Sequence, residues 1–163
     1  MKYLIALVLL LSTHNVFADN KRLRLDLNIG SYHTDRCYAG CTKEYNEFNP
    51  GIGLAYEMTR NANLVGGYLI NSFDADSFYL GVNTKLNYQL LNVRIEPGVF
   101  FGAVTGYDKI SELSSSGDNV RPVAMFNTSF TSPYGFQLNL GFLPGGIASK
   151  SGVVTFRVGY YIK

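Results

Sequence analysis

Apolar and polar residues alternate along several short segments of this chain. From Arg22 to Ile29 the alternation continues for eight residues without a fault. A period of two residues is typical of a β-strand with one apolar and one polar face. The segments 51–58 and 120–130 alternate less cleanly, and 64–71 is mostly apolar. Together the pattern predicts eight strands, over residues 22–29, 51–58, 64–71, 78–88, 93–102, 120–130, 136–142 and 154–162.

The length of these strands favours a membrane barrel over a soluble β-sandwich. Strands of about 8–12 residues are long enough to cross the hydrocarbon layer at a tilt. The apolar face is too long and too regular to be the core of a domain of this size. A membrane barrel turns its apolar residues outward and its polar residues inward, and closure leaves no unpaired strand edge in lipid. We therefore predict an all-β fold, an eight-stranded antiparallel up-and-down transmembrane β-barrel of the outer-membrane type.

The connections between the predicted strands alternate in length. Short links are expected at Thr59–Ala62, Gln89–Asn92 and Thr131–Pro133. Short turns on the periplasmic side and longer loops outside are typical of outer-membrane barrels. The even number of strands would return both ends of the barrel to the periplasm. The longer, external loops are expected at Thr34–Asn49, Ser72–Ser77, Thr105–Asn119 and Gly145–Ser151.

The beginning of the chain has the features of a cleaved signal peptide. Lys2 supplies a positive charge, residues 4–11 are apolar, and Val16-Phe17-Ala18 is a suitable cleavage site. The apolar run is too short to span a bilayer as a helix. We expect residues 1–18 to be removed and residues 19–163 to form the barrel. This predicts export to the outer membrane of a Gram-negative bacterium.

Composition narrows the chemistry that the chain can carry. Charged residues make up 16% of the sequence, below the roughly 25% of soluble domains, and the net charge of +2 is too small to indicate nucleic-acid binding. Cys37 and Cys41 are the two cysteines, and in an exported protein their spacing favours a local disulfide. A zinc site would need more ligands than His33, the one histidine beyond residue 18, can supply. We expect no metal and no cofactor.

Three polar residues are candidates for catalysis at the end of the barrel that carries the long loops. His33 ends the first predicted strand, and Asn71 and Ser72 end the third. A histidine close to a serine can take its proton at the start of acyl transfer. A lone histidine in a loop is more commonly a solvated side chain. His33 also has the odd parity of the outward residues of its strand, so it would face lipid unless a bulge near Gly30 changes the alternation.

Several stretches resemble the PagP-like outer-membrane barrels, the family of the lipid A palmitoyltransferases. That family transfers an acyl chain from phospholipid to lipid A without a cofactor. The resemblance covers most of the mature chain at low identity and rests on order and spacing rather than on one specific motif. The matching stretches are Tyr32-His33, Tyr45-Asn46-Glu47, Pro50 to Leu54, Gly67-Tyr68 with Asn71-Ser72, Pro122, Phe136-Gln137 with Leu143-Pro144-Gly145, and Gly152 to Phe156.

The resemblance implies roles for particular residues. His33 and Ser72 match the family's catalytic histidine and serine, and Asn71 stands where the family has an aspartate. An amide stabilises a histidinium much less than a carboxylate does. Asp74 and Asp76 in the same loop could substitute. Asn83 matches the glycine at the floor of the acyl pocket, where its size and polarity would shorten or wet the pocket.

The resemblance also implies a lateral entrance for lipid. Pro122 and Pro144 match positions where the family admits lipid through the barrel wall, although a proline at a strand end is also commonplace. The family's N-terminal amphipathic helix has no counterpart here. The expected partners of this chain are membrane lipids, phospholipid and lipopolysaccharide, and the protein is expected to be a monomer.

Two main hypotheses on function remain open. The first is a PagP-like lipid acyltransferase, and the second is a non-enzymatic barrel like OmpA or OmpX. A narrow pore ranks last, because side chains largely fill an eight-stranded barrel. Inward charged residues are expected to form a paired polar plug, namely Lys85, Arg94, Glu96 and Arg157. A dry slot for one acyl chain beneath Ser72 would favour the enzyme, and a filled interior would favour the structural barrel.

Overall fold

The computed structural model describes residues 23–38, 42–107, 120–145 and 151–162. The predicted signal peptide, residues 1–18, lies outside this part of the chain, as do Cys41 and most of the third long loop. The described residues contain no helix long and apolar enough to cross a membrane.

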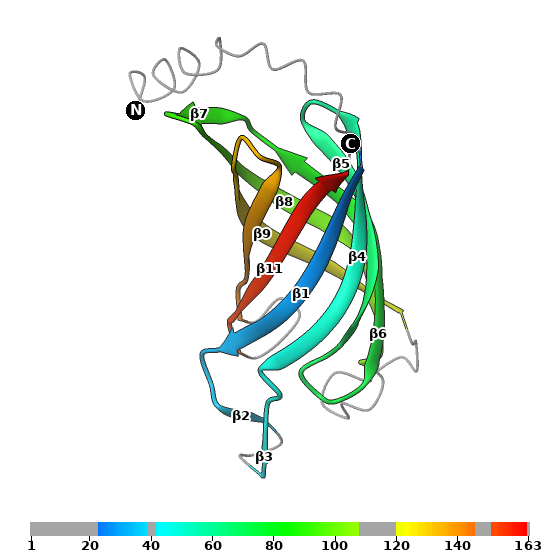
Figure 1. The fold of residues 1–163 in the computed structure, drawn as a ribbon. Coiled ribbons are helices and arrows are strands. Elements are labelled where there is room, and N and C mark those ends of the chain that lie inside the picture. Colours follow the sequence, from blue (N-terminus) through cyan, green and yellow to red (C-terminus); the bar gives the residue numbers. More distant parts are fainter. Residues whose placement is uncertain (1–22, 39–41, 108–119, 146–150, 163) are drawn as a thin grey trace, which may run out of the picture.

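Eight long strands form one closed antiparallel barrel, as Figure 1 shows. Each strand pairs with its neighbours along the chain, and β1 pairs with β11 to join the two ends. This confirms the predicted up-and-down topology. The strands are β1 (Leu23–His33), β4 (Phe48–Thr59), β5 (Ala62–Ile70), β6 (Asp76–Lys85), β8 (Val93–Thr105), β9 (Val120–Thr131), β10 (Phe136–Leu143) and β11 (Val153–Ile162).

Three short strands were not expected. β2 (Cys37–Tyr38) and β3 (Lys43–Glu44) form a small hairpin in the first long loop. β7 (Tyr88–Leu90) pairs with the beginning of β8 and continues the line of β6 after a break. The predicted strand over 78–88 is therefore interrupted. The interruption lies beside Pro97 of β8, which has no N–H for the ladder and accepts a bond from the Leu86 N–H at 2.8 Å.

The two ends of the barrel differ in their connections. The start of β1 and the end of β11 lie at one end, together with the short β4–β5, β7–β8 and β9–β10 turns (Figure 1). We call this the terminal end. The longer connections lie at the other end, which we call the loop end. The predicted alternation of short and long connections is confirmed.

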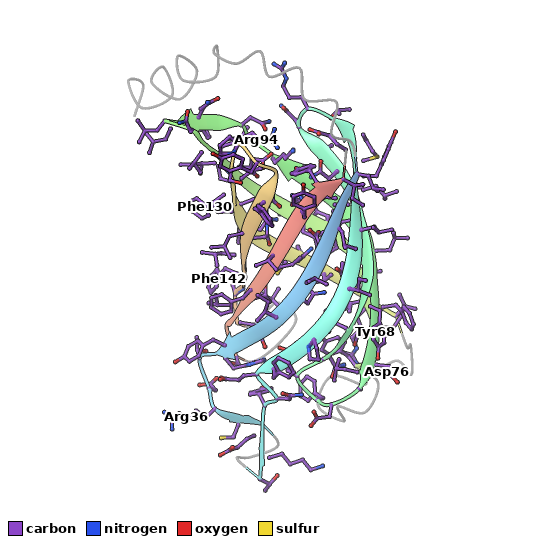
Figure 2. All side chains as sticks on the ribbon, in the orientation of Figure 1. Arg36, Tyr68, Asp76, Arg94, Phe130 and Phe142 are labelled. Carbon is purple, nitrogen blue, oxygen red and sulfur yellow. The ribbon has the colours of Figure 1, made fainter. Side chains whose placement is uncertain are left out.

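The strands turn their apolar side chains outward and many of their polar side chains inward, as predicted. Leu27, Leu80 and Phe101 are 48%, 62% and 55% exposed, whereas Asp26 and Glu96 are each 1% exposed. Figure 2 shows Phe130 and Phe142 on the outside of the wall. This inverted arrangement is the one a lipid environment requires. A small apolar cluster also lies inside the barrel, formed by Ala55, Val65 and Phe100 with Tyr79, Val123 and Met125 packed against it.

Candidate functional site

A bulge in β1 turns His33 into the barrel. The register of β1 shifts between Asn28 and Gly30 against both of its neighbours, β4 and β11. Before the shift Asp26 is buried inside, and after it His33 is buried, with 3% of its surface exposed. An extra residue in a strand moves every later side chain to the opposite face. The structure therefore confirms the bulge that an inward-facing His33 needed.

Gly30 fits the bulge because the neighbouring chain approaches it closely. A Cβ atom on Gly30 would stand 2.5 Å from the carbonyl oxygen of Glu47. That same oxygen accepts a hydrogen bond from the Ser31 N–H at 2.9 Å. A side chain at position 30 would have to push this contact apart, so glycine suits the site.

Ser31 and Asn49 connect the bulge to Ser72. Ser31 Oγ donates to Asn49 Oδ1, and Ser31 Oγ and Ser72 Oγ lie 3.3 Å apart. The backbone links the same loops, since the Asn46 N–H donates to the Ser72 carbonyl at 2.9 Å. Neither Ser31 nor Asn49 was predicted from the sequence to belong to a site. Both face inward at the loop end, and for Ser31 this follows from the bulge.

The amide of Asn71 is fully occupied by structural hydrogen bonds. Its Nδ2 donates to Ser77 Oγ and to the carbonyl of Gly106, both at 2.8 Å. Its Oδ1 accepts from the N–H groups of Phe73 and Ala75 at 2.8 and 3.1 Å. Asn71 thus holds the β5–β6 turn and ties it to the end of β8. The catalytic role assigned to it by resemblance stays a prediction.

His33 begins a chain of ring contacts across the loop end. Its imidazole stacks on Tyr45 with ring centroids 4.0 Å apart and planes 6° apart. Tyr45 meets Phe73 edge-on at 5.5 Å, and Phe73 meets Tyr107 at 5.8 Å. We call these four residues the aromatic chain. The contacts join the end of β1 to the first, second and third long loops.

Among the described residues the His33 side chain makes no hydrogen bond with Asn71 or Ser72, and its Nδ1 has no partner. The two aspartates that could have oriented it have other partners. Asp74 accepts from Asn46 Nδ2, and Asp76 accepts from Tyr68 Oη, both at 2.6 Å. Figure 2 shows Tyr68 and Asp76 side by side near the loop end. The structure brings His33 and Ser72 to the same end of the interior but does not join them.

Desolvation changes the acidity of the last ring in the aromatic chain. Tyr107 lies just beyond β8, and burial raises the pKa of its phenol to about 12. Its phenol therefore stays neutral over the physiological range.

Large side chains fill the middle of the barrel by resting on inward glycines. A Cβ on Gly53 or Gly67 would stand 2.4 or 2.7 Å from Tyr79 Oη, and one on Gly81 would stand 2.7 Å from a ring atom of Phe100. The absence of a side chain at these positions is what allows the aromatic rings to lie against the wall. Tyr79 and Phe100 therefore take up interior space that an acyl chain would need.

Asn83 lies in the interior toward the terminal end, at the position that the resemblance assigned to the floor of an acyl pocket. It is 8% exposed, and its Oδ1 accepts a hydrogen bond from Asn127 Nδ2 at 2.6 Å. The pair bridges β6 and β9 across the interior. A floor role for Asn83 stays a prediction.

Glu96 is the centre of a charged cluster near the terminal end. Its carboxylate lies 2.7 Å from Lys85 Nζ and 3.4 Å from Arg94 Nε. Thr131 and Gln137 also donate to it, at 2.9 and 3.0 Å. We call these residues the Glu96 cluster. The sequence prediction of a paired plug is confirmed for Lys85, Arg94 and Glu96.

Arg157 belongs to a second charged group on the opposite wall. Asp26 receives two bonds from the guanidinium of Arg24, at 2.6 and 2.9 Å, and lies 3.7 Å from Arg157. Tyr161 connects the two groups, since its ring contacts the guanidinium groups of Arg24 and Arg94. Charged side chains thus extend from wall to wall at this level.

Pro122 and Pro144 lie beside the part of the wall where strand pairing between β9 and β10 ends. The last described pair is Phe126 with Phe142, and β9 continues to Val120 paired with β8. Pro122 is exposed on β9, and Pro144 directly follows β10. The position of this gap agrees with a lateral entrance, whose use by lipid stays a prediction.

Two further predictions concern cysteines and metals. Cys37 is disulfide-bonded, while Cys41 lies outside the described residues, so their pairing stays a prediction. Within the described part of the chain no group of three or more His, Cys, Asp or Glu side chains could hold a metal ion.

Solved membrane barrels are similar to this chain in fold. A structure described as de novo design of transmembrane beta-barrels matches with a TM-score of 0.53 and 14% identity, covering 87% of this chain and 96% of the other. The solution structure of the designed barrel TMB2.3 matches with a TM-score of 0.52 and 17% identity, covering 89% and 98%. The N-terminal barrel domain of Pseudomonas aeruginosa OprF gives 0.49 and 11%, covering 87% and 98%.

No protein-family model and no curated protein sequence matches the chain. The similarities to solved structures do not single out the PagP-like family, so that resemblance stays a prediction. At such low identity the two designed barrels bear on the fold alone. The chain has the fold of an eight-stranded antiparallel β-barrel of the outer-membrane type.

Proposed function

We propose that this protein is a non-enzymatic, plugged barrel of the Gram-negative outer membrane that holds its long loops at the cell surface. The observation that carries the proposal is the filled interior. Tyr79 and Phe100 lie against the inward glycines Gly53, Gly67 and Gly81 in the middle, and the Glu96 cluster lies at the terminal end. Side chains in these places take up room that an aqueous channel or an acyl chain would need. The outward apolar belt supports the membrane location, with lipids as the surrounding partners.

The aromatic chain supports the second part of the proposal, that the barrel holds its long loops at the cell surface. His33 and Tyr107 anchor the two ends of the chain of rings on the barrel, and Tyr45 and Phe73 connect it to the first two long loops. Ring contacts of this kind add about 0.5–1.5 kcal/mol each beyond burial of area. They hold the loops in a fixed arrangement above the interior, which suits a scaffold for adhesion or surface masking.

The experiment that tests the proposal combines location, conductance and lipid chemistry. Fractionation of cells that express the full chain should recover it with the outer membrane. Purified protein in planar bilayers should give no steady ion conductance, and mass spectrometry of lipid A should find no added acyl mass. Steady conductance in the wild-type protein would contradict the plug, and recovery in a soluble fraction would contradict the barrel's membrane role.

A lipid A acyltransferase of the PagP-like kind is the second candidate. The observation in its favour is the bulge, which turns His33 toward the interior at the end where Ser72 is also buried. In this reading His33 takes a proton and Ser72 acts as nucleophile or polarising group. Added acyl mass on lipid A that is lost in both His33→Ala and Ser72→Ala would establish it, with Thr42→Ala in an exposed part of the first loop as control.

A further inference from the structure

The hairpin formed by β7 and the start of β8 has an apolar outer face at an end of the barrel where polar turns are expected. Leu90 is 62% exposed and Leu91, at the tip, is 87% exposed. The β4–β5 turn at the same end consists of Arg60 and Asn61. The residues on the outer face of the hairpin and its approach are Leu86, Tyr88, Leu90, Val93 and Ile95.

The tip of the hairpin retains a leucine at a backbone position that disfavours it. Leu91 has a φ of 54°, in the left-handed region where glycine or asparagine is the usual residue of a tight hairpin turn. A bulky residue is strained in this conformation. Gln89 Nε2 donates to the Leu91 carbonyl at 3.1 Å, but the side chain itself is 87% exposed, so packing within the described residues offsets little of this strain. A contact outside the protein can supply the compensation.

The lipid-facing surface of the barrel continues directly into this hairpin. Leu80 and Leu86 lie outward on the line of β6, 62% and 51% exposed, and Leu90 continues that line. The cross-strand pairs Tyr88 with Ile95 and Leu90 with Val93 put four apolar side chains on the same face. A surface continuous with the membrane belt and without charge fits lipid as its occupant.

The free edge of the hairpin limits how deeply it can lie. Among the described residues β7 pairs with β8 alone, because β5 begins at Ala62 opposite Thr84 and does not extend alongside β7. An unpaired backbone group is costly in hydrocarbon, where no water is present to bond with it. Near this edge Asn87 Nδ2 donates to the carbonyl of Arg60 at 2.9 Å. The edge therefore belongs at the level of headgroups and water, while the outer face can contact acyl chains.

We propose that the tip of the β7–β8 hairpin, centred on Leu91, lies in the interfacial layer of the leaflet at the terminal end and anchors the barrel at that depth. The inference rests on the proposed membrane location. Figure 1 shows the hairpin projecting from the rim at the end that also carries both termini of the barrel. Leucine at position 91 gains lipid contact there, which offsets its backbone strain, while the free edge of β7 keeps its access to water.

The test uses the absence of tryptophan from the sequence, so that each introduced tryptophan is the sole reporter. Leu91→Trp in phosphatidylcholine vesicles should lose emission strongly to lipids brominated near the headgroup end of the acyl chain. Lipids brominated near the methyl end should quench it less, and aqueous iodide little. Arg60→Trp, in the polar turn at the same end, is the matched control and should be quenched by iodide instead.

A second control separates the hairpin from the barrel. Leu27→Trp, in the middle of β1 on the outer belt, should be quenched by the deeply brominated lipid. If Leu27→Trp is not quenched by any brominated lipid, the proposed membrane location itself fails. If Leu27→Trp is quenched but Leu91→Trp responds to iodide alone, the hairpin proposal fails and the barrel stands. Protection of Leu91→Trp from both quenchers would indicate a second copy or another protein on the hairpin, which also overturns the proposal.

Discussion

Lys85 Nζ lies 2.7 Å from Glu96 Oε1, and the side chains of this pair are 2% and 1% exposed. The pair joins β6 to β8 inside the barrel, and Arg94, Thr131 and Gln137 complete the surroundings of the carboxylate. A buried charge costs several kcal/mol to desolvate, so each partner depends on the other. The Glu96 cluster is therefore both the plug at the terminal end and a sensitive point for stability.

Removal of the carboxylate should destabilise the barrel. Glu96→Leu leaves Lys85 with Glu57 at 3.4 Å as its remaining carboxylate partner. We expect the free energy of unfolding to fall by about 3–5 kcal/mol, as when one member of a buried pair is lost. Urea unfolding of the protein in lipid vesicles, followed by tyrosine fluorescence or by mobility on a gel, measures the change.

The double variant gives this prediction its control. Lys85→Met combined with Glu96→Leu should be less destabilised than the sum of the two single variants, because neither member of this pair is then left buried without the other. Lys43→Met, in the exposed β3 strand, should change stability little. A loss of stability in the double variant equal to the sum of the two single losses would contradict an energetic coupling between Lys85 and Glu96.

A methyl group added at the inward glycine Gly53 should lower the free energy of unfolding. In Gly53→Ala the new Cβ would stand 2.4 Å from Tyr79 Oη. Overpacking of this kind costs about 1–3 kcal/mol. Gly66→Ala is the matched comparison, because its Cβ would meet the end of the flexible Leu80 side chain at 3.1 Å, and it should cost less. Unfolding in urea provides the measurement for both variants.

A compensating change tests whether Tyr79 is the cause. Tyr79→Leu removes the phenol that Gly53→Ala meets, so the double variant should recover part of the loss caused by Gly53→Ala. If the loss of stability in the double variant equals the sum of the two single losses, contact with Tyr79 is not the cause of the loss in Gly53→Ala.

The strands and their facing were predictable from the sequence, whereas the geometry of the candidate site was not. Alternation is a local property, so the outward Leu27 and the inward Asp26 follow from neighbouring residues alone. The bulge before Gly30 moves every later residue of β1 to the other face, and a single glycine marks it in the sequence. Hence His33 has the parity of a lipid-facing residue and yet lies inside.

Other features of the site depend on contacts between distant segments. Asn71 Nδ2 donates to the carbonyl oxygen of Gly106, thirty-five residues away, and only the folded barrel brings the two together. The same holds for Ser31 and Ser72, which come from different strands. The expectation that Asn71 stands in place of an aspartate says nothing about the four hydrogen bonds that its amide makes.

Those bonds predict the effect of an aspartate at position 71. Asn71→Asp replaces the donor that serves Ser77 Oγ and the Gly106 carbonyl with an acceptor, so a carboxylate oxygen would face a carbonyl oxygen. A buried group left without its partner costs about 1–3 kcal/mol, and more when it is charged. We expect lower stability in urea and faster proteolysis at the loop end.

A matched substitution controls for the change of charge. Asn92→Asp alters an exposed residue in the β7–β8 turn and should leave stability within about 0.5 kcal/mol of the wild-type protein. If Asn71→Asp is as stable as Asn92→Asp and adds acyl mass to lipid A, the structural role of Asn71 is wrong and the acyltransferase hypothesis gains support.

The raised pKa of Tyr107 makes the loop end sensitive to alkaline pH. Burial raises the pKa of its phenol to about 12 in the folded protein, against the usual value of 10. Because the folded state holds this proton more tightly, its contribution to stability is complete below pH 10 and is lost as pH rises from 10 to 12. Tyr107→Phe cannot ionise, so its stability should fall less than that of the wild-type protein over this interval. Unfolding midpoints in urea, measured at several pH values, should show a difference between the two proteins that is constant below pH 10 and then shifts in favour of Tyr107→Phe.

Tyr134→Phe, which removes the phenol of a 78% exposed residue, should follow the wild-type profile. Parallel profiles for all three proteins up to pH 12 would contradict the raised pKa of the Tyr107 phenol.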